Sequence, residues 1–198
     1  VWIDRRDVRG APPPRREAAI ASLYTKIVVH GGAEKAFTLS DLYIYDQVLR
    51  TWTDYTYFAQ GSKPTPRRLH KMVAMGSTKA IMSGGTTMIG AKTAEVFTLD
   101  TSSLPPTWTD ITQTVGPGPS ARSGHSMVAQ GRKAYVFGGE DEDGILLSDL
   151  WVLTISNLMD NEMSWSRLDL ANAPTRGRMG HSMVASGATM FLLGGVFE

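Results

Sequence analysis

One motif recurs three times along this chain and constrains its fold more than any other feature. The pattern His-x-Met-Val-Ala-x-Gly occupies residues 70–76, 125–131 and 181–187, and each copy runs on into an apolar segment that stops at two glycines. A blurred first copy ends at Gly31-Gly32. The second glycines of the four pairs, at positions 32, 85, 139 and 195, lie 53, 54 and 56 residues apart. A period close to this length is typical of one supersecondary unit that is stacked repeatedly.

Each repeat contains four runs of strand length and no helical periodicity. The motif begins the first run, the glycine pair ends the second, and an alternating run such as residues 41–46 (DLYIYD) forms the third. A tryptophan marks the fourth run, at Trp2, Trp52, Trp108 and Trp165. The sequence therefore predicts a single all-β domain of repeated units. We expect residues 1–10 to be the last strand of a preceding unit, complete units at 11–60, 61–114 and 115–171, and the first half of a fourth at 172–198.

The apolar residues of each unit predict how the units pack. A four-stranded antiparallel sheet with apolar residues on both faces needs a covering layer on each side. One large aromatic side chain on the fourth strand buries about 150–250 Å² when it packs against a neighbour. Radial stacking lets each sheet cover the next and leaves only short edges, which is the β-propeller arrangement.

These features together resemble the kelch-repeat β-propeller family. The third unit matches the family pattern most fully, with Arg122, Gly124-His125, Gly138-Gly139, Trp151 and Trp165. Propellers of this family usually have six or seven blades, so the resemblance implies that this segment is part of a larger propeller.

Two units depart from the pattern. In the second unit Leu69 stands where glycine is usual, although Arg67 and His70 fit. In the first unit Arg15 fits, but Ala18 stands in the place of the histidine.

Four arginines hold one repeat position, in the loop that enters the first strand of each unit: Arg15, Arg67, Arg122 and Arg178. The architecture places these loops and the loops after the glycine pairs on one face. The resemblance implies that this face binds partners, often through basic residues that recognise acidic peptides. Guanidinium groups suit bidentate bonds to carboxylates. The arginines are therefore candidates for binding an acidic peptide or loop of a partner protein. The alternative is a scaffold role, in which each arginine joins blades through backbone carbonyls or an acidic side chain.

An acidic run directly follows the glycine pair of the third unit, at Glu140, Asp141, Glu142 and Asp143. The run occurs in one unit only, so it is a second candidate for partner binding, through a basic partner or a cation. A hydrated surface loop is the alternative.

The recurring histidines His70, His125 and His181 share one strand position, so structural hydrogen bonds are expected of them rather than metal ligation. His30, which precedes its glycine pair, has no counterpart in the other repeats. No metal site is expected.

Composition and missing motifs favour a non-catalytic function. The net charge is +1, so no global field attracts nucleic acid or a membrane, and no run is apolar enough to span a bilayer. Nucleophile-elbow, phosphate-loop and zinc-protease motifs do not occur, and there is no cysteine. We expect a protein-interaction module with no cofactor. An enzyme or small-ligand propeller with its active residues in other blades is the alternative. The absence of cysteines and of a glycosylation sequon favours an intracellular location.

Overall fold

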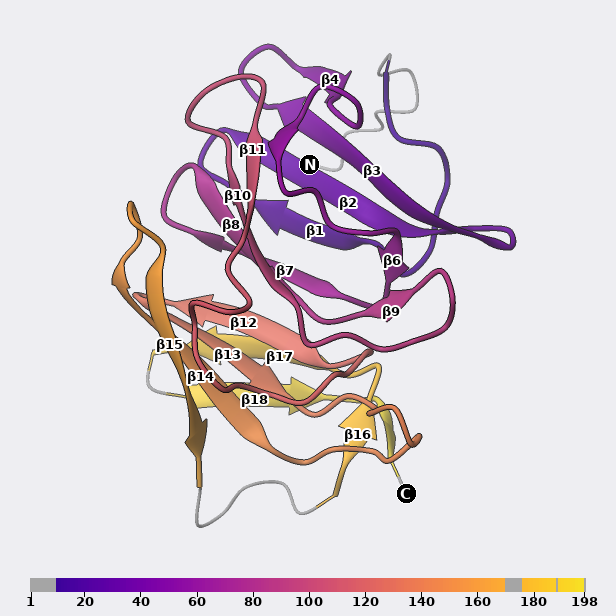
Figure 1. The fold of residues 1–198 in the computed structure, drawn as a ribbon, viewed down its shortest axis with the longest axis vertical. Helices are drawn as coiled ribbons and strands as arrows, with labels where there is room; N and C mark the ends of the chain where they lie inside the picture. Colours follow the sequence, from indigo (N-terminus) through magenta and orange to yellow (C-terminus); the bar gives the residue numbers. More distant parts are fainter. Residues whose placement is uncertain (1–9, 170–175, 188, 198) are drawn as a thin grey trace.

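The computed structural model describes residues 10–169, 176–187 and 189–197 (Figure 1). These residues form strands and loops and no helix, so the prediction of an all-β fold is confirmed. Each of the first three units folds into one antiparallel sheet, a blade, whose four main strands follow one another in chain order. The first two strands of the fourth unit form a two-stranded sheet.

The strand bounds repeat from blade to blade. Blade 1 contains β1 (Ala19–Ser22), β2 (Lys26–Glu34), β3 (Phe37–Asp46) and β4 (Thr51–Asp54). Blade 2 contains β7 (Lys71–Met75), β8 (Lys79–Ser83), β10 (Val96–Asp100) and β11 (Thr107–Asp110), and β5 (Gln60–Gly61) joins the outer edge of β11 in parallel. Blade 3 contains β12 (Ser126–Gln130), β13 (Lys133–Phe137), β14 (Leu150–Asn157) and β15 (Glu162–Leu168). The last sheet contains β17 (Ser182–Ser186) and β18 (Thr189–Leu193).

Short ladders tie the loop after each glycine pair to the segment that enters the same blade. In blade 2, β6 (Arg67–Arg68) pairs with β9 (Thr86–Thr87), and in the fourth unit β16 (Arg178–Met179) pairs with β19 (Val196–Phe197). Single bridges repeat this pairing in blades 1 and 3, at Arg16–Ala33 and Ser123–Glu140. The two sets of loops therefore lie together at one end of the strands, along one side of the molecule in Figure 1.

The glycine pairs are required by close approach of the backbone. Gly84 and Gly85 both have positive φ, at 69° and 106°. A Cβ atom at Gly85 would lie 2.7 Å from the Cβ of His70 and 2.9 Å from the carbonyl oxygen of Arg68, too close for any L-residue. The pair therefore lets the second strand leave its sheet and turn against the incoming segment of its own blade.

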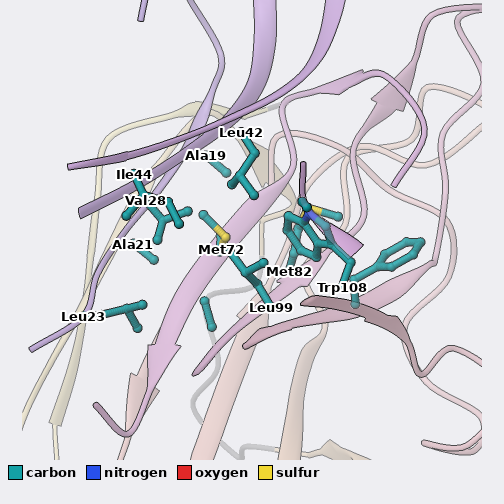
Figure 2. Close-up of a cluster of buried hydrophobic side chains, with 13 residues drawn as sticks. Ala19, Ala21, Leu23, Val28, Leu42, Ile44, Met72, Met82, Leu99 and Trp108 are labelled. Carbon is teal, nitrogen blue, oxygen red and sulfur yellow. The ribbon is translucent and has the colours of Figure 1, made fainter. Parts of the chain in front are cut away.

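Two apolar clusters hold the blades together. The first lies between blades 1 and 2, and Figure 2 shows side chains of blade 1, among them Val28 and Leu42, beside Met72 and Trp108 of blade 2. The second lies between blades 2 and 3 and joins side chains such as Ile81 of blade 2 to side chains such as Val136 and Trp165 of blade 3. Burial of a large aromatic side chain contributes about 1.5–3 kcal/mol, so Trp108 is a major anchor of the first interface.

A chain of backbone hydrogen bonds runs from blade to blade just before the innermost strands. The N–H of Leu69 donates to the Glu17 oxygen (3.0 Å), that of Gly124 to the Leu69 oxygen (3.0 Å), and that of Gly180 to the Gly124 oxygen (2.8 Å). All four residues have positive φ, between 57° and 68°. Leu69, which the sequence places where glycine is usual, and Glu17 thus adopt the left-handed conformation that glycine adopts in the later blades, at a cost in backbone strain.

Part of the predicted organisation lies outside the described residues. The strand expected at residues 1–10, with Trp2, falls almost wholly in 1–9, and the loop that enters the fourth unit includes 170–175. The described part of the chain contains no helix with the length and hydropathy to cross a membrane.

Candidate functional site

The histidines lie between the blades. All four side chains are buried. Nδ1 of His30 lies 3.1 Å from Nε2 of His70 across the boundary of blades 1 and 2, and the two rings meet edge to face at 5.1 Å. Nε2 of His181 lies 2.7 Å from Oγ of Ser126 across the boundary of blades 3 and 4. Among the described residues, no group of three or more His, Cys, Asp or Glu side chains is arranged to hold a metal ion.

Burial keeps these imidazoles neutral. Removal from water lowers the pKa of His30 and of His125 to about 3, and the nearby guanidiniums of Arg67 and Arg122 act in the same direction. Burial also lowers the pKa of His70 well below its ordinary value. A general acid or base works best with a pKa near the operating pH, so these three side chains are not tuned for proton transfer at neutral pH.

The repeated arginines are paired within their own blades. Arg122 donates from both terminal nitrogens to Asp149, at 2.6 and 2.9 Å, and from Nη1 to the Gly138 oxygen. Arg15 makes the same bidentate pair with Asp41, at 2.5 and 2.8 Å, and Arg67 pairs with Glu95. Glu95 and Asp149 directly precede the third strands of their blades, and Asp41 lies in the middle of β3.

These pairs place the charge of the arginines in the interior. The side chains of Arg67 and Arg122 are 0% and 2% exposed, and burial of Asp149, which alone would raise its pKa, is outweighed by the bonds from Arg122, so this pKa is lowered. Arg178 of the fourth unit is half-buried; its Nη1 lies 3.4 Å from the Gly194 oxygen and its guanidinium lies over the Phe197 ring. The arrangement favours the scaffold alternative for Arg67 and Arg122. Their ion pairs, however, join parts of one blade and do not join one blade to the next.

The acidic run divides into two halves. Glu140 pairs with Lys92 of the neighbouring blade at 2.8 Å, and Lys92 also donates to the Asp141 oxygen at 2.5 Å. Oδ1 of Asp141 accepts from the backbone N–H groups of Asp143 and Ile145 and shapes the turn. The side chains of Glu142 and Asp143 are exposed. Only these two acids are therefore directed to solvent.

The structure adds a set of residues that sequence reasoning missed. In each of the three complete blades the loop after the glycine pair ends in an exposed apolar side chain, and we call this set the apolar tips: Phe37, Met88, Ile89 and Ile145. Their exposed fractions are 72%, 69%, 84% and 57%. The available signal was an apolar residue three to six positions beyond the second glycine of each of these repeats, in a loop rich in polar residues.

A separate hollow lies at the outer edge, between β11 and the β14–β15 hairpin. It encloses about 490 Å³ and is lined by Thr109, Asp110, Ile111, Thr114, Ser156, Asp160, Asn161, Glu162, Met163 and Ser164. It contains none of the residues expected to bind a partner.

Known proteins resemble this chain in sequence and in fold. Residues 75–197 match the model of the KLHDC2/KLHL20/DRC7 Kelch-repeats domain. This chain belongs to the kelch-repeat family. It is similar to Adagio protein 3 of Arabidopsis thaliana, with 32% identity over 84% of this chain and 27% of that protein, and to the Rab9 effector protein with kelch motifs of Bos taurus, with 33% identity over 86% of this chain and 44% of that protein. The kelch chain thus spans less than half of the length of each of these relatives.

The fold resembles a solved structure as well. The kelch chain superposes on the structure of YjhT with a TM-score of 0.73 at 17% identity, over 92% of this chain and 59% of that one. This likeness supports the propeller blade arrangement and nothing finer. The predicted resemblance to the kelch family is confirmed.

Proposed function

We propose that this kelch chain is a non-catalytic protein-interaction module that presents the loops of one face to a protein partner. The relatives include a protein described as a Rab9 effector, which fits a role in protein binding. The observation that carries the proposal is the placement of the loops. Each complete blade extends a loop beyond its glycine pair at the same end of its strands, and each is tied to the entering segment by a ladder or bridge.

The packing between blades supports this proposal through rigidity. Apolar clusters and paired charges hold the blades, so the loops project from a fixed base. A partner that docks on pre-ordered loops pays little conformational entropy at the contact. The proposed face comprises the loops after the glycine pairs and the entering loops; the repeated arginines, which hold the entering loops in place, would act at its base, and Glu142 and Asp143 at its surface.

Site-specific photocrosslinking tests the proposal. A photoreactive phenylalanine analogue at position 142, in the loop face, is compared with the same analogue at position 24, where Tyr24 is 84% exposed at the opposite end of the blade. After irradiation in an extract, we expect protein adducts at position 142 and few at position 24. An excess of the unmodified chain should suppress the adducts at position 142, and an excess of the Glu142→Lys variant should suppress them less. Equal adducts at the two positions, or adducts at 24 alone, would contradict the proposal.

A further inference from the structure

Closed turns of the loops hold the apolar tips in their exposed positions. In blade 2 the backbone N–H of Thr87 donates to the Ala91 oxygen at 2.8 Å and that of Gly90 to the Thr87 oxygen at 3.0 Å, so Met88 and Ile89 sit at the end of a closed turn. In blade 3 the N–H of Asp141 donates to the Ile145 oxygen at 3.1 Å. Single exposed apolar residues are ordinary, but a side chain held outward by a closed turn in successive blades forms a set.

The loops of blades 2 and 3 form one rigid unit. Lys92 leaves the root of the blade 2 loop and reaches Glu140 and the Asp141 oxygen of the blade 3 loop. Its side chain is only 13% exposed, so solvent weakens this ion pair less than it would a surface pair. The spacing between Ile89 and Ile145 is therefore set before any partner arrives.

Charge is distributed unevenly along the apolar tips. At the blade 1 end, Arg16 and Lys35 are exposed, and Arg16 and Arg68 share Glu17 as an ion-pair partner, at 3.7 and 2.8 Å. Glu34 is the cross-strand partner of Phe37, so three cationic side chains stand against two acidic ones and leave a small positive excess. At the blade 3 end, Glu142 and Asp143 are exposed and make no ion pair with any described residue. The face is thus cationic near Phe37 and anionic near Ile145, with apolar side chains between.

We propose that the partner protein docks through an apolar segment that carries an acidic group toward blade 1 and a basic group toward blade 3. This inference rests on the proposed function and names the chemistry of the partner. It differs from recognition of an acidic peptide by the repeated arginines, because the guanidiniums of Arg67 and Arg122 are already bonded to carboxylates of their own blades. Apolar contacts supply affinity, and the opposed charges fix the direction of the segment.

Peptide display on the immobilised chain tests this inference. The probe is a library of random 16-residue peptides, selected in parallel on the wild type, on Phe37→Ser/Ile89→Ser, and on the control Tyr24→Ser from the opposite face. We expect the wild type and the control to enrich peptides with clustered apolar residues and both charges. We expect the double variant to bind those peptides at least about tenfold more weakly at an unchanged melting temperature.

A second arm tests direction. On Glu142→Lys/Asp143→Lys, selection should replace the basic residue of the enriched peptides with an acidic one and retain their apolar centre. Enriched peptides that are uniformly acidic, that ignore the double serine variant, or that do not change on charge reversal would overturn the inference, and so would the absence of any enrichment. Each of these failures leaves the photocrosslinking result free to support protein binding at this face through other chemistry.

Discussion

Acidification should destabilise this chain steeply in a pH range where most proteins change little. All four histidines are buried, and burial lowers the native pKa to about 3 for His30 and His125, to about 4 for His181, and well below 6.5 for His70. The unfolded chain therefore binds protons that the native state does not, so stability is fully present above pH 6.5 and falls as the pH drops toward the native values. Each such histidine removes about 1.4 kcal/mol between pH 7.5 and 5.5, and the four together about 5 kcal/mol.

This loss is a large part of the roughly 5–15 kcal/mol by which domains are stable. The carboxylates whose pKa values are lowered, Asp100 and Asp149, have ordinary values of 3.8, so their contribution is lost only below this window. All four histidines of the chain are buried, so the native state offers no exposed imidazole that would bind protons at the same pH.

Urea unfolding at half-unit pH intervals measures the effect. We expect the slope of unfolding free energy against pH near 5.5 to correspond to about three to four protons taken up on unfolding, and His125→Gln to reduce this number by about one, whatever its effect on stability at pH 7.5. A free energy of unfolding that stays constant from pH 7.5 to 5.5 would refute the reasoning, because it would mean that the imidazoles are protonated in the native state.

Two further predictions concern the blade scaffold. Asp149→Asn leaves the buried Arg122 without its carboxylate and should lower the free energy of unfolding by about 3 kcal/mol in urea melts. The control Asp143→Asn, in the exposed loop, should change this free energy by less than about 0.5 kcal/mol. Equal effects of the two substitutions would argue against a buried ion pair. Gly85→Ala should cost more than Gly90→Ala by at least about 2 kcal/mol in thermal unfolding, because both residues have positive φ but only Gly85 is crowded, by His70 and Arg68. Similar costs at the two glycines would show that backbone strain alone decides the outcome.

The blade architecture could be predicted because its determinants are local and repeated. Strand alternation, the glycine pairs and the tryptophans each recur with nearly constant spacing. Comparison of the copies therefore distinguishes residues that build every blade from residues that occur in one blade only. The acidic partners of the arginines also recur, since Asp41, Glu95 and Asp149 follow their arginines by 26, 28 and 27 residues. That spacing is visible in the sequence. It predicts an ion pair only when the third strand is known to begin beside the loop that enters the blade.

Contacts made by single blades could not be predicted. Lys92 and Glu140 come from the loops of neighbouring blades and form an ion pair there, and the other described repeats contain no equivalent pair that would reveal it in the sequence. His30 has no counterpart in the other repeats, yet its side chain packs opposite His70 of the next blade. The equivalent positions of the next two blades, just before their glycine pairs, are occupied by Ser83 and Phe137. The apolar tips were missed for a related reason: apolar residues in a sequence suggest burial, and only the closed turns of the loops direct them outward.

The backbone hydrogen bonds between blades have a consequence for how such a chain changes length. Every link joins the same donor of one blade to the same acceptor of the blade before it, from Glu17 through Leu69 and Gly124 to Gly180. A duplication or excision that begins and ends at these equivalent residues would leave each remaining donor opposite an acceptor, and each glycine pair opposite an entering segment. Duplications and deletions are therefore best tolerated when they begin and end at this row of peptide groups near the inner strands. The chain can gain or lose whole blades there without leaving backbone N–H or C=O groups unpaired.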